Sequence, residues 1–241
     1  MPSASAAGAG PGSLPPSLEA DRRAFVAALR STTEGLRPGD PRRGWLQDGR
    51  ALELWDRYAA IVHEYSERLA IVARGDRGRL YTRHIMDSLN PLGLFDAPPD
   101  SILDVGAGGG FPGVPLAIAW PRTRVTLLES REKKAGFLEM VIRELALSNA
   151  RAICARLEEY GNGQRTVERF DAVTIRAVGG LPELLLGAQR ACAPGATWIY
   201  FVGSGERVEG LARSLEVAGF ASDRRLGLFD GVLLVGRFPS V

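Results

Sequence analysis

The sequence predicts an α/β fold: a doubly wound, mostly parallel seven-stranded sheet with an antiparallel last strand, preceded by an N-terminal helical extension. Two observations support this prediction. From about residue 101 onward, short apolar runs alternate with helical patterns, which is typical of a parallel sheet covered on both faces. The last two apolar runs are joined through Asp230 and Gly231, a tight-turn pair that predicts an antiparallel hairpin.

The first part of the chain has the pattern of helices. Residues 1–17 are mainly Ala, Gly, Ser and Pro, and they are predicted to form a disordered tail. Helical spacing of apolar residues then predicts helices over about 18–30, 48–68 and 80–92, with a break at GLRPGDPRRG, residues 35–44. We therefore expect a helical extension over residues 18–96 and a sheet domain over 97–241.

The sheet domain is predicted element by element from its alternating pattern. With 45% hydrophobic residues in 241, the chain can bury a core of this size. The expected strands cover residues 101–105, 124–129, 150–154, 170–175, 196–202, 223–229 and 232–238. The expected helices cover residues 113–120, 131–146, 181–192 and 206–218.

Composition indicates the cellular compartment of the protein more clearly than its binding partner. The formal net charge is only +2, and the only lysines are Lys133 and Lys134; the other basic residues are arginines, which suit phosphate. Cys154 and Cys192 are the only cysteines, as in a reduced cytoplasmic protein. No apolar run approaches the ~20 residues of a membrane span. We expect a cytoplasmic monomer with no membrane partner.

The stretch DVGAGGGFPG, residues 104–113, predicts a nucleotide-binding corner, because it joins a buried strand to a helix. Dinucleotide sites need G-x-G-x-x-G, and Phe111 stands where the third glycine would be. S-adenosylmethionine sites instead have an acidic residue just before a G-x-G pattern, and here Asp104 precedes Gly106 and Gly108 in this way. There, acidic residues near the turn help to hold the ammonium group, and the glycines make room for the rest of the ligand.

Glu129 ends the next predicted strand, where a carboxylate accepts hydrogen bonds from two ribose hydroxyls. Nicotinamide and S-adenosylmethionine sites both use that contact, so Glu129 indicates an adenosine nucleoside without choosing between them. The predicted terminal hairpin does choose, because an antiparallel last strand is typical of the methyltransferase variant of this fold. A nicotinamide oxidoreductase is therefore the less favoured interpretation.

Longer motifs carry a family resemblance. The run DVGAGGGFPGVPLAI resembles the signature of the small-subunit ribosomal RNA guanine-N7 methyltransferases, also called glucose-inhibited division protein B. RHIMDSL, residues 83–89, resembles that family's R-H-I-x-D-S-L helix, and the similarity covers about residues 50–200. The resemblance implies S-adenosyl-L-methionine as cofactor and a guanine of 16S ribosomal RNA or of the 30S subunit as substrate. It assigns cofactor contacts to Gly106, Phe111, Leu157, Glu158 and Arg176.

Basic residues near the expected mouth of the site are the candidates for RNA phosphate contacts. An alternative interpretation has His84 bonded within the N-terminal helices. Asp87 lies three residues after His84, on the same face of the predicted helix, and either caps the cofactor site or pairs structurally. The RNA-binding candidates are Arg74, Arg77, Arg79, Arg83, His84, Lys133 and Lys134.

The expected chemistry requires positioning and no proton transfer. Guanine N7 carries a lone pair and no proton, so its methylation needs no general base, and we assign no catalytic acid, base or metal ligand. Two alternatives stay open: a small-molecule methyltransferase of the same fold, and a non-catalytic nucleoside-binding module. The first would explain why the family's lysine before a glycine is missing ahead of Gly203.

Overall fold

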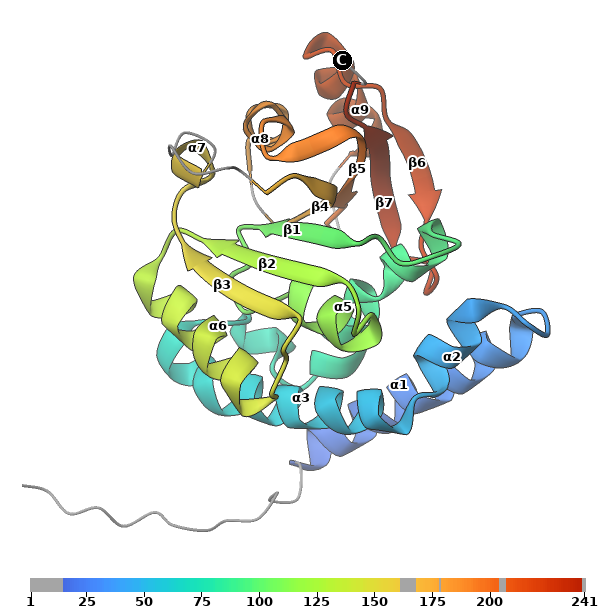
Figure 1. The fold of residues 1–241 in the computed structure, drawn as a ribbon. Helices are drawn as coiled ribbons and strands as arrows, with labels where there is room; N and C mark the ends of the chain where they lie inside the picture. The colour runs from blue at the N-terminus through green and yellow to red at the C-terminus, as the bar shows by residue number, and fades with distance from the viewer. Residues whose placement is uncertain (1–14, 161–167, 178, 204–206, 240–241) are drawn as a thin grey trace, which may run out of the picture.

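The computed structural model describes residues 15–160, 168–177, 179–203 and 207–239, and Figure 1 shows its sheet between two helical layers. Most of the predicted tail, residues 1–14, lies outside the described residues. The tail prediction was wrong for its last two residues, because helix α1 begins at Pro16. Proline is favoured in the first turn of a helix, where its missing N–H costs nothing.

The helical extension begins with three α-helices. The segment predicted as a break holds the start of a separate helix, because Asp40 accepts a hydrogen bond from the backbone N–H of Arg42 and caps it. Asp48 caps the next helix through the N–H of Arg50. The three helices are α1 (Pro16–Gly35), α2 (Pro41–Gln47) and α3 (Gly49–Leu69).

The single helix predicted over residues 80–92 is instead a series of short helices of different pitch. Asp21 of α1 accepts hydrogen bonds from the backbone N–H groups of Tyr81 and Thr82, and thereby fixes the start of a π-helix. Pro91 cannot continue an α-helix, since it lacks an N–H and restricts Asn90 before it. The segments are η2 (Leu80–Ile85), α4 (Met86–Ser88) and η3 (Asn90–Leu94), and a further short helix, η1 (Arg74–Asp76), precedes them.

The sheet confirms the predicted topology. Its strand order is β3-β2-β1-β4-β5-β7-β6, with β1 to β5 parallel and β7 antiparallel to both β5 and β6. All five residues of β1 are buried, as expected for a central parallel strand. The strands are β1 (Ser101–Val105), β2 (Arg124–Glu129), β3 (Ala150–Cys154), β4 (Phe170–Arg176), β5 (Cys192–Phe201), β6 (Asp223–Leu226) and β7 (Val232–Arg237).

Helices cover both faces of the sheet. On one face, α5 and α6 pack on the strands, and α3 packs on α5 and α6. Trp55 and Tyr58 of the extension therefore share a core with Leu138. On the other face, α8 and α9 bury Leu185 and Leu215. These helices are α5 (Gly113–Ala119), α6 (Glu132–Glu144), α7 (Leu157–Tyr160), which the sequence did not predict, α8 (Leu181–Gln189) and α9 (Val208–Val217).

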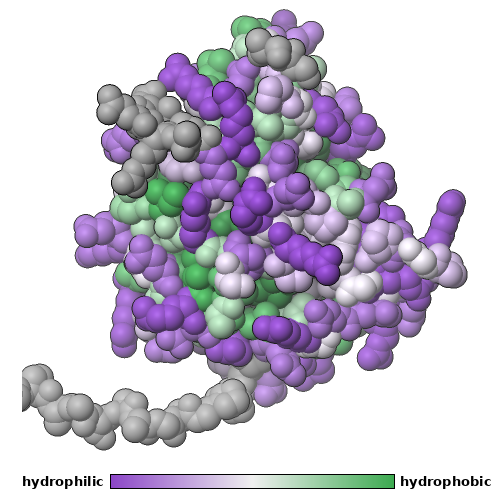
Figure 2. Space-filling model, viewed as in Figure 1, coloured by the Kyte–Doolittle hydropathy of each residue, from purple (hydrophilic) through white to green (hydrophobic). Residues whose placement is uncertain are grey.

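The surface is mixed. Figure 2 shows the face seen in Figure 1 as largely hydrophilic, with apolar side chains showing through in the middle of the view. Across the described ranges, the helices are too short or too polar to traverse a lipid bilayer.

Candidate functional site

A cleft of about 890 Å³ opens at the carboxyl ends of the parallel strands, within the size range of small-molecule sites. Its floor follows the order of the sheet, from the end of β2, over the glycine turn after β1, to the ends of β4 and β5 and the start of β7. Residues between 71 and 87 form the opposite wall, here called the roof. The cleft therefore has two ends, one over β2 and β1 and one over β4, β5 and β7.

The glycine turn has the backbone conformation that the sequence predicts. Gly106 has φ 70° and Gly108 has φ 57°, backbone angles that residues other than glycine rarely adopt. Gly113 is required for a different reason, because a Cβ there would lie 2.2 Å from a methyl carbon of Leu127. Gly106 and Gly108 line the cleft, while Gly113 lets helix α5 pack against β2.

Asp104 lies beneath the glycine turn and not on the cleft wall. Its side chain is buried; one carboxyl oxygen accepts a hydrogen bond from the Gly113 N–H at 2.9 Å and the other from the Thr174 hydroxyl at 2.8 Å. Burial raises the pKa of Asp104 to about 7. Asp104 thus ties the start of α5 to β4, and its carboxyl group does not line the cleft, so a cofactor contact of Asp104 stays a prediction.

Glu129 holds its carboxylate at the β2 end of the cleft. Oε2 accepts a hydrogen bond from the Gly108 N–H at 2.9 Å, and Oε1 accepts one from the Arg131 N–H at 2.8 Å. An ionised carboxylate has about four acceptor positions, so further donors can be bound. The residue lines the cleft and is only 6% exposed, so its orientation is fixed by backbone groups before any ligand arrives.

Phe111 forms the wall between the glycine turn and the roof. Its ring centroid lies 5.1 Å from that of Tyr58 and 5.0 Å from that of His84. The Tyr58 hydroxyl donates a hydrogen bond to the Gly109 carbonyl at 2.7 Å, and burial raises the pKa of Tyr58 well above its ordinary value. Helix α3 therefore fixes the outer side of the turn through a neutral phenol.

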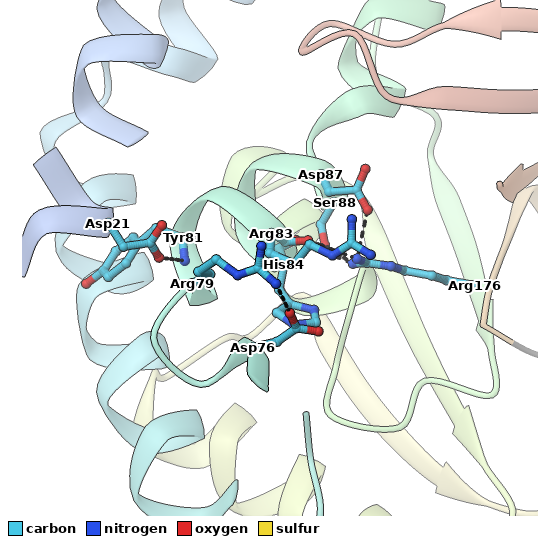
Figure 3. A network of polar contacts seen from close by, with 9 residues as sticks. All are labelled: Asp21, Asp76, Arg79, Tyr81, Arg83, His84, Asp87, Ser88 and Arg176. Carbon is cyan, nitrogen blue, oxygen red and sulfur yellow. Dashed lines mark hydrogen bonds and ion pairs between the residues drawn. The ribbon is translucent and has the colours of Figure 1, made fainter. Parts of the chain in front are cut away.

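Arg176, the last residue of β4, connects the floor of the cleft to the roof (Figure 3). Its guanidinium lies 2.7 Å from Oδ2 of Asp87 and donates to the backbone carbonyl of Arg83 at 3.1 Å. It also donates to Oγ of Ser88 at 3.3 Å and lies 5.8 Å from the ring centroid of Phe201. The resemblance assigned Arg176 to the cofactor; here it anchors the roof while lining the cleft.

His84 lies in the roof beside Asp76, with Nε2 3.8 Å from a carboxylate oxygen (Figure 3). Burial lowers the pKa of His84 to about 4, with the Arg176 charge as the next cause. The ring is therefore neutral at pH 7 and offers no charge to a phosphate. Asp87 pairs with Arg176, not with His84, because the irregular helix does not keep the spacing of an α-helix.

The other RNA-binding candidates differ in how they lie relative to the cleft. Arg83 and Lys134 line the cleft, while Arg74 and Lys133 are exposed outside its wall. Arg79 pairs with Asp76 at 2.7 Å on the outer side of the roof. Arg77 turns away: it pairs with Glu67 at 2.8 Å and donates to the carbonyl of Ser66 at 3.1 Å. Of the seven RNA-binding candidates, Arg77 is the one whose side chain binds the end of helix α3.

Leu157 and Glu158 begin helix α7, next to β3 in the sequence, and do not line the cleft. Leu157 is buried against helix α8, so close to Gly187 that a Cβ added to that glycine would lie 3.1 Å from the Leu157 side chain. The chain between 161 and 167, which follows α7, lies outside the described residues. The adenine contacts expected of Leu157 and Glu158 therefore remain predictions.

Sequence reasoning missed the cleft residues that come from distant segments. Asp76 of the roof, Phe201 and Val202 after β5, and Gly231 and Val232 at the start of β7 all line the cleft. No local motif marks them. The strand order could have found the last two, because β7 inserts between β5 and β6 and brings its amino end to this edge of the sheet.

A second cavity of about 620 Å³ lies elsewhere, between η3 and the sheet face of β5, β7 and β6. It is lined by residues such as Phe95, Thr197 and Arg237 and by none of the predicted site residues. The cleft over the glycine turn is therefore the candidate site.

Known proteins resemble this chain in sequence. The family model described as rRNA small subunit methyltransferase G matches residues 51–218. Ribosomal RNA small subunit methyltransferase G of Geobacillus kaustophilus is 37% identical over 144 residues, 59% of this chain and 60% of that protein. The protein of the same name from Exiguobacterium sibiricum is 31% identical over 202 residues, 83% of this chain and 80% of that protein. The chain spans about three fifths of the length of the first relatives that it matches.

Similarity of fold extends further than similarity of sequence. The crystal structure of precorrin-6y C5,15-methyltransferase from Geobacter metallireducens aligns with a TM-score of 0.50 at 17% identity. The alignment covers 67% of this chain and 92% of that one. At this identity the likeness establishes the shared fold alone.

Proposed function

Because the chain belongs to the rRNA small subunit methyltransferase G family, we propose that it is an S-adenosylmethionine-dependent enzyme that methylates N7 of a guanine in 16S ribosomal RNA. The observation that carries the proposal is the β2 end of the cleft. There, two glycines with positive φ and a carboxylate held by backbone N–H groups meet at one wall. The proposed location is the cytoplasm, where this RNA is found, and the proposed state is a monomer.

The residues present fit S-adenosylmethionine. Glu129 would hold the ribose hydroxyls, since its carboxylate lines the cleft and retains acceptor positions. The turn at Gly106 and Gly108 leaves space for the amino acid end, because no side chains project from these positions. When bound, this cofactor supplies a methyl group on a positively charged sulfur.

The chain's own contribution is positioning and electrostatics. Guanine N7 is already a nucleophile, so the enzyme needs only to align the two reactants and exclude water. The neutral state of His84 and the neutral phenol of Tyr58 agree with a wall that transfers no proton. Carboxylates on the wall, at Asp76, Asp87 and Glu129, favour the positive charge that passes to the base.

The RNA would approach over the roof side of the cleft. Arg83 and Lys134 line the cleft, and Arg74 and Lys133 lie exposed beyond its wall. Such cations fix the position of a phosphate backbone without reading sequence. The target base would have to leave its stack to enter the cleft, as in other enzymes that act on nucleic acid bases.

The proposal is tested by labelled methyl transfer. The purified chain is incubated with methyl-labelled S-adenosylmethionine and, separately, with 30S subunits, naked 16S RNA and a metabolite extract. We expect label in 16S RNA at one guanine that becomes sensitive to borohydride and then to strand cleavage, which is the signature of N7 methylation. The position of cleavage maps the target.

Two results would overturn the proposal. Label only in small molecules would indicate the small-molecule alternative. Tight binding of S-adenosylhomocysteine without transfer to any acceptor would indicate a non-catalytic nucleoside-binding module.

A further inference from the structure

The position of Asp87 in the cleft is fixed by two contacts, and the residue lies close to the start of β7. Its Oδ2 pairs with Arg176 at the end of β4, 2.7 Å away. Its Oδ1 accepts a hydrogen bond from the side-chain amide of Asn90 at 3.0 Å. Its Oδ1 also lies 3.0 Å from the position of a Cβ on Gly231, at the start of β7. Asp87 therefore lies over β4, β5 and β7, at the end of the cleft away from Glu129, and Figure 3 shows its carboxylate directed toward Arg176.

Asn90 makes this arrangement rigid. Besides its bond to Oδ1 of Asp87, its amide donates to the Asp87 backbone carbonyl at 2.9 Å. Its carbonyl oxygen accepts from the N–H groups of Phe229 and Gly231, at 2.8 and 3.2 Å. The residue is 1% exposed, so this connection between the roof and the turn before β7 is shielded from water.

The Asp87 carboxylate is held but not saturated. Among the described residues, each oxygen has one partner, Asn90 on Oδ1 and Arg176 on Oδ2, and a carboxylate offers about four acceptor positions. The side chain is 34% exposed and lines the cleft. A ligand in this end of the cleft thus meets two free acceptor positions on one oriented carboxylate, beside the apolar Phe201 and Val232.

We propose that Asp87 reads the target guanine by accepting hydrogen bonds from its N1–H and its exocyclic N2 amino group. This inference rests on the proposed function. Guanine has adjacent N1–H and amino donors that match the two oxygens of a carboxylate, and adenine has no N1–H. Contact at this edge leaves the N7 lone pair free to face the β1 and β2 end of the cleft, where the methyl donor is proposed to lie.

The same contact gains strength as the reaction proceeds. When N7 accepts a methyl group, the base becomes positively charged and its N1–H becomes more acidic. A hydrogen bond from that N–H to a carboxylate is therefore stronger in the transition state than in the bound substrate. Asp87 would lower the barrier as well as select the base, without taking part in proton transfer.

The other carboxylates on the wall are less suited to this contact. Glu129 lies at the opposite end, over β2, and its two oxygens face Gly108 and Arg131. Asp76 is 20% exposed and is paired with Arg79 on the outer side of the roof, next to His84. Of the carboxylates that line the cleft within the described ranges, Asp87 is the one placed over β4, β5 and β7.

The test compares guanine with hypoxanthine, which keeps N7 and N1–H but lacks the N2 amino group. Two 16S RNAs are made by ligation, one with guanosine and one with inosine at the mapped target. Wild-type protein, Asp87→Asn and Asp100→Asn are then compared for kcat/KM on both RNAs. Asp100→Asn is the matched control, because this exposed residue precedes β1 at the far edge of the sheet. Dimethyl sulfate gives the intrinsic reactivity of N7 in the two nucleosides.

We expect wild type and Asp100→Asn to prefer guanosine by about 10- to 100-fold beyond the intrinsic ratio. Asp87→Asn should lower the rate on guanosine and reduce this preference to within about threefold, while its affinity for S-adenosylhomocysteine changes less than about threefold. A merely structural role would lower both rates together and leave the preference intact.

Three outcomes would overturn the inference. Equal wild-type rates on both RNAs would do so alone, even if Asp87→Asn failed to fold. An unchanged preference in folded Asp87→Asn would also contradict it, while leaving the proposed function standing. Absence of methyl transfer from the wild type to guanosine RNA would remove the proposed function and this inference together.

Discussion

The two ends of the cleft are built in different ways, and their carboxylates show the difference. Glu129 is oriented by backbone N–H groups of Gly108 and Arg131, which come from the turns after β1 and β2. Asp87 is oriented by the side chains of Asn90 and Arg176, one from η3 and one from β4. The first end depends on local turn geometry, whereas the second depends on long-range side-chain contacts. Substitutions should therefore act differently at each end.

The largest effect on stability is expected from Asn90→Ala. This change leaves the partly buried N–H groups of Phe229 and Gly231 without their acceptor and removes a buried side chain, at a cost of about 3 kcal/mol in the free energy of unfolding. Urea denaturation measures it. Gln47→Ala, which removes an exposed amide from α2, should stay within about 0.5 kcal/mol of wild type. Equal stability of the two variants would show that the roof is not held through Asn90.

The largest effect on ligand binding is expected from Glu129→Gln. The neutral amide keeps one acceptor oxygen for two backbone N–H groups and loses its charge toward the ribose hydroxyls, so S-adenosylhomocysteine should bind about 100-fold more weakly. Isothermal titration calorimetry measures the affinity. Glu132→Gln, an exposed residue in the first turn of α6, serves as control. If the affinity of Glu129→Gln for S-adenosylhomocysteine changed less than threefold, the Glu129 carboxylate would not bind the cofactor.

The roof and the residues beneath the glycine turn should respond to pH in opposite directions. At the roof, burial lowers the pKa of His84 to about 4, below the usual value near 6.5. Its contribution to stability is complete above pH 6.5 and is lost as the pH falls toward 4, an effect of roughly 2 kcal/mol. His84→Gln should therefore flatten the acid limb of the stability profile. An identical acid limb in the variant would mean that the ring is not buried.

Beneath the glycine turn, burial raises the pKa of Asp104 to about 7, above the usual value near 3.9. Its contribution is complete below pH 4 and is lost as the pH rises toward 7. Asp104→Asn does not titrate, so its stability relative to wild type should improve by roughly 2 kcal/mol between pH 5 and pH 8. Denaturation at these two pH values measures the difference, and a constant difference would contradict the assignment.

The smallest effect is expected at the rim. Lys134 lines the cleft and is partly exposed, so Lys134→Ala should weaken RNA binding a few-fold and reduce the salt slope by about one. Filter binding at several salt concentrations measures both. Arg77→Ala removes a cation already paired with Glu67 and should leave RNA binding unchanged. The reverse order of effects would place the RNA on the other side of the roof.

The same contrast explains what could be predicted from the sequence. The mostly parallel sheet was predictable because buried parallel strands are apolar throughout, and the glycine turn because positive φ selects glycine. The conformation of residues 80–94 was not predictable, because it is fixed by Asp21, Arg176 and the turn that Asn90 contacts. Asp104 fits the motif in sequence, yet its carboxyl group is engaged beneath the turn. The motif therefore predicted where Asp104 lies in the chain but not the direction in which its side chain points.

The most direct test of the two-ended cleft is a crystal structure of the protein with S-adenosylhomocysteine. We predict that both ribose hydroxyls donate hydrogen bonds to Glu129, that the amino acid end lies along Gly106 and Gly108, and that Asp87 keeps two acceptor positions free of the ligand. A ligand whose ribose or amino acid end lies against Asp87, or one bound outside this cleft, would contradict the division into a cofactor end and a base end.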